Sequence, residues 1–578
     1  MPVNRSRTRS LRLLPGVDRL RHYDRAWLGG DLLAGATVAA YLIPQVMAYA
    51  QVAGLPAVTG LWATIGALLV YAVLGSSPQL SVGPESTTAL MTAVALGGVA
   101  AGDPGRYAAL AGLLAILVGA TCLVAWVGRL GFLAELLSRP VLVGYMLGVA
   151  VIMIVGQLGR LTGIRVPSGG PLSELADTAT HLGAAHLPTV FLAGAVLVFL
   201  FAVQAWLPRV PGPLVGMLLA AAAVALFDLK SRGIAVVGHV ASALPHVQVP
   251  HIGSADVVAL LPAALGITMV AYSDNVLTGR AFATRGSDAV DNNQELLALG
   301  AANVAAGMSQ GFPVSSSGSR TAIGNAAGSH SQLYSLAALA VVLVVVTVLG
   351  PVLAAFPNGA LGAVVVYAAT RLVDVSELRR MAGFRRTELY LAVGTTVGVL
   401  ILGVLQGVLF AIALSVLDLL HRVARPHDGV LAFVPGLAGM HDVDDYPQAQ
   451  QVAGLVVYRY DSPLFFANAQ DFLRRALLSA ETSPTPPEWF LLNAEANVSV
   501  DITALDALHD LQEELGRRGI TLAMARVKQD LRADLERGGF IQCVGEDRVF
   551  ATLPTAVQAY VEWYRERHGT TPAGYGGA

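Results

Sequence analysis

Charged residues and cysteines are scarce in this chain. Asp, Glu, Lys and Arg make up 13% of its 578 residues, whereas a soluble protein has about 25%. The two cysteines cannot build a disulfide framework, because Cys122 lies in an apolar run and Cys543 in a charged part of the chain. The net charge of −2 gives no indication of a nucleic-acid partner. With 54% hydrophobic residues, the composition is typical of a protein embedded in a lipid bilayer.

Several signals and sites are also missing. The arginine-rich segment 1–27 has no apolar core ahead of the first long apolar run, so it is not a cleavable signal peptide. We expect this segment to be cytoplasmic, and a nucleic-acid-binding arm is disfavoured because a membrane span follows at once. The C-terminal part has no metal cluster, phosphate loop or nucleophile–base pair, so the sequence indicates neither an enzyme nor a cofactor.

Apolar runs near 20 residues long fill the chain from Leu28 to Leu420, and this length crosses a bilayer core of about 30 Å. We expect about 14 spans, seven of them starting near residues 30, 58, 85, 107, 140, 188 and 213 and seven near 257, 293, 315, 332, 360, 387 and 404. An odd number of spans per repeat inverts the second copy, which is typical of secondary transporters. The predicted parts are a cytoplasmic segment 1–27, a transmembrane transport domain 28–423 with repeats of about 28–230 and 256–423, a linker 424–450, a small α/β domain 451–566 and a flexible tail 567–578.

The distribution of cationic residues predicts the orientation. Short loops on the side of the N-terminus carry twelve arginines, and those on the other side carry five cationic residues. Because 14 spans return the chain to its starting side, we expect both termini in the cytoplasm and a multi-pass protein of the inner (plasma) membrane. The twelve are Arg129, Arg139, Arg209, Arg280, Arg285, Arg371, Arg379, Arg380, Arg385, Arg386, Arg422 and Arg425, and the five are Arg106, Arg160, Arg165, Lys230 and Arg232.

Two polar patches interrupt the apolar sequence, "VGPESTTALM" (82–91) and "GFPVSSSGSRTA" (311–322). Each comes third in its set of spans and is too short and polar for a full span, so we expect two half-helices. Their prolines, Pro84 and Pro313, are 313 − 84 = 229 positions apart. A proline at a helix start leaves the next N–H groups free, and two such N-termini from inverted halves would form an anion site. Arg320 adds a full positive charge.

Two carboxylates accompany these patches. Asp274 and Thr278, in "AYSDNVLTGRAFA", share a helix face and offer oxygen ligands for a small cation or a proton site. A structural ion pair of Asp274 with Arg280 or Arg320 is the alternative. Glu85 stands at a helix N-terminus, which favours its charge, but it would repel a bound anion. It therefore either faces away or is protonated when substrate binds.

Three motifs together resemble the sulfate permease (SulP) family of anion transporters, which includes the solute-carrier-26 proteins. "YLIPQVMAYAQVAGLPAVTGLW" (41–62) is similar to the family's first-span signature, "VDNNQELLALGAANVAAG" (290–307) to its Asn-Gln-Glu-Leu motif, and "FPVSSSGSRTA" (312–322) to its tenth-span motif. The C-terminal part resembles a STAS domain. The resemblance covers nearly the whole chain and implies core and gate bundles from a seven-plus-seven inverted repeat, a homodimer, and an anion held between the third and tenth spans.

Carried over to this chain, the anion-binding residues would be Gln45, Glu85, Ser86, Thr87, Ser317, Gly318, Ser319 and Arg320. "YSDNVLT" is similar to the sodium-binding segment of cyanobacterial sodium–bicarbonate transporters, which implies that Asp274 and Thr278 are cation ligands. The family more often has a small or apolar residue in place of Glu85, so proton coupling stays open beside sodium coupling.

The STAS resemblance adds one candidate modification site. In soluble STAS domains a Ser or Thr two residues after an Asp is phosphorylated, and Asp501 and Thr503 fit this spacing. Ala504 stands where a glycine is usual. The alternative is a helix-capping Thr503 in a domain that only dimerises or regulates.

The sequence therefore predicts a secondary active transporter of a small inorganic oxyanion, sulfate or bicarbonate, coupled to Na⁺ or H⁺ and working by alternating access. A dicarboxylate or nucleobase transporter, an anion channel, and a membrane-anchored sensor signalling through the STAS domain are the alternatives. Arg320 and the paired helix N-termini favour an anion. The expected partners are the anion, the bilayer, a second copy of the chain and a cytoplasmic partner of the STAS domain.

Overall fold

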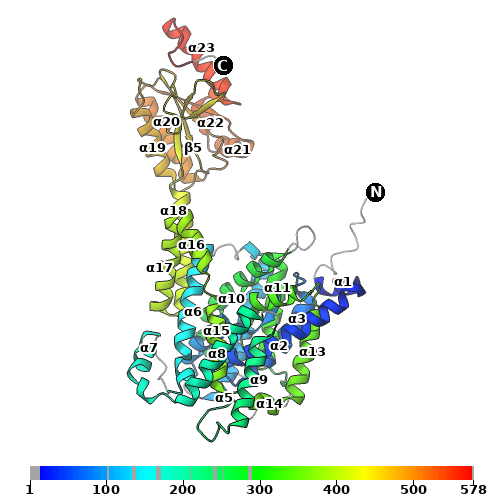
Figure 1. Ribbon diagram of the computed structural model, residues 1–578. Coiled ribbons are helices and arrows are strands. Elements are labelled where there is room, and N and C mark those ends of the chain that lie inside the picture. The colour runs from blue at the N-terminus through cyan, green and yellow to red at the C-terminus, as the bar shows by residue number, and fades with distance from the viewer. Residues whose placement is uncertain are drawn as a thin grey trace. The chain divides into compact units, whose positions relative to one another are not determined.

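The computed structural model describes residues 14–100, 103–132, 138–164, 171–207, 210–238, 244–250, 253–283 and 290–575. The chain forms two compact units, and the boundary between them follows Ser415, within helix α18. The first unit is helical, whereas the second contains a six-stranded sheet (Figure 1). Three of the arginines counted in the loops, Arg165, Arg209 and Arg285, lie outside the described residues, as does most of the N-terminal arginine cluster.

Fourteen of the described helices follow the predicted spans in order. Those of the first half are α2 (Leu28–Val52), α3 (Val58–Leu74), α4 (Ser86–Gly97), α5 (Pro104–Val127), α6 (Arg139–Thr162), α8 (Leu187–Trp206) and α9 (Gly212–Leu226). Those of the second half are α10 (Ser254–Phe282), α11 (Asn292–Met308), α12 (Gly318–Ala326), α13 (Leu333–Val348), α15 (Asn358–Thr370), α17 (Arg386–Leu402) and α18 (Val404–Ala424). Shorter helices between or before them are α1 (Pro15–Arg21), α7 (Pro171–Thr180), α14 (Gly350–Ala354) and α16 (Val375–Phe384).

Apolar length supports a membrane location for this unit. Among the described residues, six helical segments are long and apolar enough to cross a membrane, namely Arg25–Val52, Pro104–Val127, Arg139–Thr162, Leu187–Trp206, Ser254–Phe282 and Asn358–Phe384. Four further apolar helices, α3, α4, α9 and α13, are shorter. Shortened helices are expected where an irregular segment at membrane depth is enclosed by protein rather than exposed to lipid.

The helix packing repeats between the two halves. Helix α5 packs on α11 and α10, and its counterpart α13 packs on α3 and α2. In the same way α6 packs on α17 while α15 packs on α8, and α2 packs on α12 while α10 packs on α4. Each of these contacts has an equivalent between the corresponding helices of the other half. The unit therefore has an internal two-fold repeat, as in secondary transporters. This confirms the predicted seven-plus-seven fold.

Glycines allow the closest of these contacts. On α5, a Cβ at Gly119 would lie 2.6 Å from the carbonyl oxygen of Gly300 on α11, and a Cβ at Gly112 would lie 3.0 Å from that of Gly307. Both pairs are seven positions apart on their own helices, so they lie on one face of each. In lipid the hydrophobic effect gives helices little driving force to associate, so they associate through close packing at such small residues.

Each half-helix is introduced by a two-residue strand. β1 (Val82–Gly83) pairs antiparallel with β2 (Ser315–Ser316), and the N–H of Ser317 donates to the carbonyl of Ser81 over 2.9 Å. Both strands are fully buried. Non-helical backbone at membrane depth is tolerated only where protein or a water-filled cavity surrounds it, and here the two halves satisfy each other's backbone groups.

The two prolines do not hold matching positions, which corrects the alignment made from the sequence. Pro84 follows β1 and stands two residues before Ser86, the first residue of α4. Pro313 instead precedes β2 and stands five residues before Gly318, the first residue of α12. The half-helices are therefore 318 − 86 = 232 positions apart rather than 229. Only the first half-helix is introduced by its proline.

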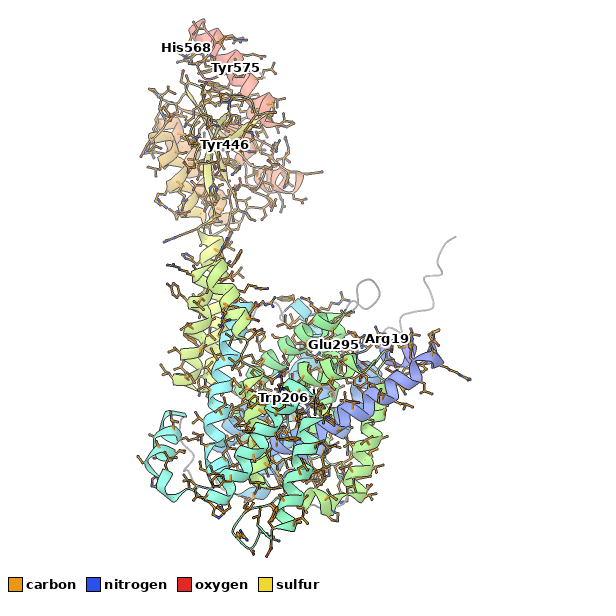
Figure 2. The ribbon with its side chains drawn as sticks, in the orientation of Figure 1. Arg19, Trp206, Glu295, Tyr446, His568 and Tyr575 are labelled. Carbon is orange, nitrogen blue, oxygen red and sulfur yellow. The ribbon has the colours of Figure 1, made fainter. Side chains whose placement is uncertain are left out.

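A buried carboxylate fixes the helices around the strands. Glu295, labelled in Figure 2 near the start of α11, is fully buried. It accepts hydrogen bonds from the Tyr71 hydroxyl (3.0 Å), the Ser76 hydroxyl (2.6 Å) and the Asn275 amide (2.5 Å). These donors come from α3, the segment after α3, and α10. Glu295 thereby joins three elements of the inner helices.

The second unit is a sheet with the strand order β4-β3-β5-β6-β7-β8. β3 is antiparallel to β4 and β5, and β5 to β8 are mutually parallel. The strands are β3 (Asp428–Phe433), β4 (Met440–Asp442), β5 (Leu455–Tyr460), β6 (Trp489–Asn493), β7 (Thr521–Ala525) and β8 (Val549–Phe550). One face packs against α19 (Ala469–Glu481), α20 (Ile502–Arg517), α21 (Gln529–Arg537) and α22 (Phe540–Val544), and the other against α23 (Leu553–His568).

The predicted α/β character of this unit is confirmed, but its limits differ from the sequence-based boundaries. β3 and β4 lie within 424–450, the segment expected to be a linker. At the other end α23 continues to His568, which Figure 2 labels together with Tyr575. The carbonyl of Ala573 accepts the N–H of Ala453 over 2.8 Å, and the ring of Tyr575 packs edge-on against Phe433. The described part of the expected flexible tail is therefore packed on the sheet.

Candidate functional site

A cavity of about 730 Å³ lies where the two half-helices begin. Its walls come from α2, α4, α6, α8, α10, β2, α12 and α15, so residues from both halves of the first unit meet around it. Six of the eight predicted anion-site residues line it, together with both predicted cation ligands: Gln45, Glu85, Thr87, Ser317, Gly318, Ser319, Asp274 and Thr278. The remaining two, Ser86 and Arg320, are not among its lining residues.

The N-terminus of α12 opens on this cavity. Ser317 is the N-cap residue and its side chain makes no capping hydrogen bond. Its hydroxyl lies 3.3 Å from the hydroxyl of Ser319, and Gly318 places no side chain between them. The first N–H groups of a helix have no partner within the helix and carry partial positive charge. This end of α12 thus offers hydroxyl and backbone donors to an anion.

The N-terminus of α4, in contrast, is occupied by the chain's own carboxylate. Glu85 is the N-cap residue, and its Oε2 accepts the N–H of Thr87 over 2.8 Å. The hydroxyl of Ser86 donates to the same carboxylate over 2.7 Å. Because Glu85 also lines the cavity, the expectation that it faces away is wrong. Of the two helix N-termini predicted to be free for an anion, that of α12 has no side-chain cap, and that of α4 is capped by the carboxylate of Glu85.

A second carboxylate shares the cavity. Asp274 accepts a hydrogen bond from the hydroxyl of Ser316 over 3.1 Å, and Thr278 lines the cavity one turn further along α10. Within the described part of the chain, no Asp or Glu carboxylate lies within 4.0 Å of the guanidinium of Arg320, so Asp274 is not its ion-pair partner. Oxygen atoms of Asp274, Thr278 and Ser316 are the groups that a small hard cation prefers.

Arg320 is fully buried behind β1 and does not face the cavity. Its Nη1 donates to the carbonyl of Pro84 over 3.0 Å, and its Nε contacts the hydroxyl of Ser81 at 3.4 Å. Nη2 has no hydrogen-bond partner among the described residues, and a Cβ at Gly83 would lie 3.4 Å from it. This position corrects the expectation that Arg320 contacts the anion directly. Its positive charge lies behind the wall of the cavity rather than on its surface.

Two further polar residues of the cavity, Tyr41 and Tyr49, were missed by the sequence analysis. They lie four positions before and after the predicted Gln45 on α2, and all three line the cavity. This spacing puts them on one helix face, which is a signal that the sequence did contain. The side-chain carbonyl of Gln45 is buried without a hydrogen-bond partner among the described residues. Gln45 therefore has an amide available for a bound solute.

Thr503 is exposed in the first turn of α20. The helix is capped by Asp501, whose carboxylate accepts the N–H of Ala504 over 2.9 Å and that of Phe466 over 2.7 Å. Because Asp501 caps the helix, the hydroxyl of Thr503 is not needed for that purpose. The exposed position leaves Thr503 open to a modifying enzyme or a partner protein.

Comparison with known proteins gives relatives over nearly the whole chain. A protein of Mycobacterium tuberculosis (strain ATCC 25618 / H37Rv) named "Probable sulfate transporter Rv1739c" is 58% identical over 546 residues, which cover 94% of this chain and 98% of that protein. "Sulfate transporter 4.1, chloroplastic" of Arabidopsis thaliana is 28% identical over 95% of this chain and 83% of its own length. Both are named as transporters, not as enzymes.

Solved structures share the fold. Murine Solute Carrier 26 family member A9, described as an anion transporter in the inward-facing state, matches with a TM-score of 0.87 and 23% identity over 97% of this chain and 96% of that chain. The transmembrane domain of the cyanobacterial bicarbonate transporter BicA matches with a TM-score of 0.59 and 21% identity over 68% of this chain and 98% of that chain. At these identities the likeness concerns the fold alone.

Family models divide the chain as its two units do. The model of the STAS domain matches residues 446–556, which include β5 to β8, the helices α19 to α22 on one face of the sheet and the start of α23 on the other. The model of the sulfate permease family matches residues 28–395, from the start of α2 into α17, and thus includes both half-helices and the cavity between them. The chain therefore belongs to the sulfate permease family and carries a C-terminal STAS domain.

Proposed function

We propose that this protein is a secondary active transporter of small inorganic oxyanions, sulfate or bicarbonate, working by alternating access. The observation that carries the proposal is the uncapped N-terminus of α12, with the hydroxyls of Ser317 and Ser319, at the wall of a polar cavity between the two halves. Relatives named sulfate transporters favour sulfate as the first anion to test. A helix N-terminus with hydroxyl donors suits a tetrahedral or planar oxyanion.

The proposed anion-binding residues fall into two groups. Gln45, Thr87, Ser317, Gly318 and Ser319 line the cavity and would contact the anion. Arg320 and Ser86 would act without contact, since the first places a positive charge behind β1 and the second holds Glu85. A buried guanidinium without a carboxylate partner is costly in a membrane protein unless an anion or oriented dipoles offset its charge.

Cation coupling is proposed from the two carboxylates of the cavity. Glu85 and Asp274 line it together, and an oxyanion entering beside them would add a further negative charge. Such a site is filled at low cost only when a proton or Na⁺ enters as well. Asp274 with Thr278 would take the Na⁺ or the proton, and Glu85 would take a proton when the anion binds.

The surroundings of the protein are also proposed. We place both termini in the cytoplasm and the helices in the inner membrane, following the excess of arginines on one side. We expect a homodimer and a cytoplasmic partner of the STAS domain. The exposed Thr503 is the proposed phosphorylation site on that domain. Phosphate there would add negative charge beside Asp501 in the first turn of α20.

The test is uptake of labelled sulfate and of labelled bicarbonate into proteoliposomes under an imposed Na⁺ or H⁺ gradient. Wild type is compared with Asp274→Asn and Ser319→Ala. We expect wild type to accumulate one of the anions only with one of the gradients, Asp274→Asn to lose the dependence on the gradient, and Ser319→Ala to need a higher anion concentration. If wild type moves neither anion under any gradient, the proposed function is wrong.

A further inference from the structure

A second cavity, of about 420 Å³, lies in the first unit away from the half-helices. It forms where α2 and α6 end and where α8 and α15 begin, and its lining includes Gln51, Arg160, His186, Thr189 and Asn358. Under the proposed topology these helix ends are on the outer side of the membrane, so we call this space the outer cavity. Exposed glycines, among them Gly54, Gly163 and Gly233, form its rim.

The charge of the outer cavity is positive. Arg160 is half-buried, and among the described residues its guanidinium is held only by neutral oxygens, the side-chain carbonyl of Gln157 at 3.1 Å and the main-chain carbonyl of Gln51 at 2.7 Å. No Asp or Glu is among the lining residues, and in the described ranges no carboxylate lies within 4.0 Å of this guanidinium. A partly desolvated cation without a counter-charge attracts an anion strongly.

Two helix ends add to this charge. α8 starts after His186 and α15 starts after Pro357, and neither cap residue makes a side-chain capping hydrogen bond. Thr189 in the first turn of α8, and Asn358 and Gly359 in that of α15, line the outer cavity. The partial positive ends of both helices therefore point to the same space as the guanidinium. The partial negative C-terminal ends of α2 and α6 oppose these two helix ends, so the full charge of Arg160 leaves the potential of the cavity positive.

The outer cavity and the central one share the helices of their walls. The same four helices, α2, α6, α8 and α15, line both cavities at different heights. On α2, Gln45 lines the central cavity and Gln51 the outer one, and six positions correspond to about 9 Å along a helix axis. Gln51 also donates to the side chain of Asn358 over 2.9 Å, so α2, α6 and α15 are joined at the outer cavity.

We propose that the outer cavity is a second binding site for a small oxyanion, centred on Arg160, from which the anion passes to the central cavity. The anion would take the place of the neutral oxygens that now satisfy the guanidinium. Losing the bond from Arg160 to Gln51 would loosen α2 from α6, which is the separation needed to open the path inward. The class of anion rests on the proposed function, whereas the position of the site rests on the geometry alone.

The test measures how many sulfate ions the full-length protein binds. Purified protein in nanodiscs is equilibrated with labelled sulfate at low ionic strength, for wild type, Arg160→Gln, Arg160→Lys and Arg232→Gln. Arg232→Gln is the matched control, because Arg232 is an exposed arginine after α9 whose side chain is not part of the lining. Thermal unfolding of each variant shows that it is folded.

We expect wild type and Arg232→Gln to bind two sulfates per chain. Arg160→Gln should bind one, with the affinity of the outer site lowered at least about tenfold, as for the loss of a charge-assisted hydrogen bond. Arg160→Lys should keep both sites with the outer one weakened. In uptake, Arg160→Gln should raise the KM for outside sulfate, because fewer ions are held at the outer site.

Two results overturn the outer site. In the first, wild type binds a single sulfate per chain and Arg160→Gln does not change its affinity. In the second, Arg232→Gln loses as much sulfate binding as Arg160→Gln, which would reflect the surface potential only. The proposed function fails separately, if wild type shows no gradient-driven uptake of either anion whatever the binding stoichiometry. Wild type without any bound sulfate would contradict both the outer site and sulfate as substrate.

Discussion

The guanidinium of Arg320, in the second half of the membrane domain, donates to the carbonyl of Pro84 in the first half over 3.0 Å. The contact lies behind the paired strands β1 and β2, next to the cavity but not on its surface. One side chain thus places a positive charge at the wall of the proposed anion site and also joins the two half-helices. Its substitution should affect both transport and stability.

Arg320→Ala should destabilise the protein by about 1–3 kcal/mol, because the buried carbonyl of Pro84 loses its donor. Uptake should fall as well, since the positive charge behind β1 is gone. Arg320→Lys should recover part of the uptake but little of the stability, because an ammonium cannot contact Pro84 and Ser81 together as the planar guanidinium does. Thermal unfolding in detergent and uptake by proteoliposomes measure the two effects. An Arg320→Ala protein with wild-type stability would contradict this role.

Glu85→Gln should increase the affinity for the anion by about tenfold, because the amide keeps the shape of the cap at α4 but removes a negative charge from the cavity. The KM for the anion should fall, and uptake should depend less on an imposed proton gradient. Asp103→Asn is the matched control, since Asp103 caps α5 in the same manner at an exposed position. Unchanged KM and unchanged pH dependence in Glu85→Gln would exclude Glu85 from the coupling.

Gly300→Ala should lower the stability of the membrane domain by about 1–3 kcal/mol through overpacking. The added Cβ would lie 3.0 Å from both the carbonyl oxygen of Gly119 and the Cβ of Cys122, at the contact of α5 with α11. Gly194→Ala on α8 is the control, because a Cβ there meets nothing within 4 Å. The midpoint of thermal unfolding should fall for the first variant only. Equal midpoints would show that α5 and α11 can separate without cost.

Asp471 predicts a pH dependence of the STAS domain. Burial alone would raise the pKa of its carboxyl, but a hydrogen bond from Arg474 (2.6 Å) and an ion pair with Arg475 (2.9 Å) outweigh burial and hold the pKa below the ordinary value. The stabilisation is therefore fully present above the ordinary carboxyl pKa of about 4 and is lost as the pH falls through the lower folded pKa. Chemical unfolding should separate wild type from Asp471→Asn at pH 7. The two should converge in strong acid, and a constant difference would contradict the assignment.

The membrane spans could be predicted because their signal is local. Each span is an apolar run of sufficient length, and α2 to α18 follow the predicted order closely. The positions of the half-helices could not be fixed equally well. A match of Pro84 with Pro313 placed them 229 positions apart, whereas their first residues, Ser86 and Gly318, are 232 positions apart, because β2 lies between Pro313 and its half-helix. Strand pairing joins residues far apart in the chain, and no local pattern reports it.

Most residues of the candidate site could be predicted from the sequence, but the orientations of their side chains could not. Ser317, Ser319 and Asp274 line the cavity as expected, because polar side chains in apolar spans are confined to such places. The side chain of Arg320 lies behind β1, and that of Glu85 caps α4. Both positions depend on which backbone groups the side chain can reach in the folded protein. Arg160 was only counted as a loop charge, since nothing in its neighbourhood along the chain shows the ends of four helices around it.

The pairing of β1 with β2 has a consequence for synthesis. Val82 and Gly83 leave the ribosome more than 230 residues before their partners, Ser315 and Ser316. At a rate of about 5–20 residues per second, the first half waits on the order of ten seconds or longer with these amide and carbonyl groups unpaired at membrane depth. The seven spans of the first half therefore cannot satisfy all their backbone groups by themselves. If the two halves are made as separate chains, each should be degraded unless both are produced together.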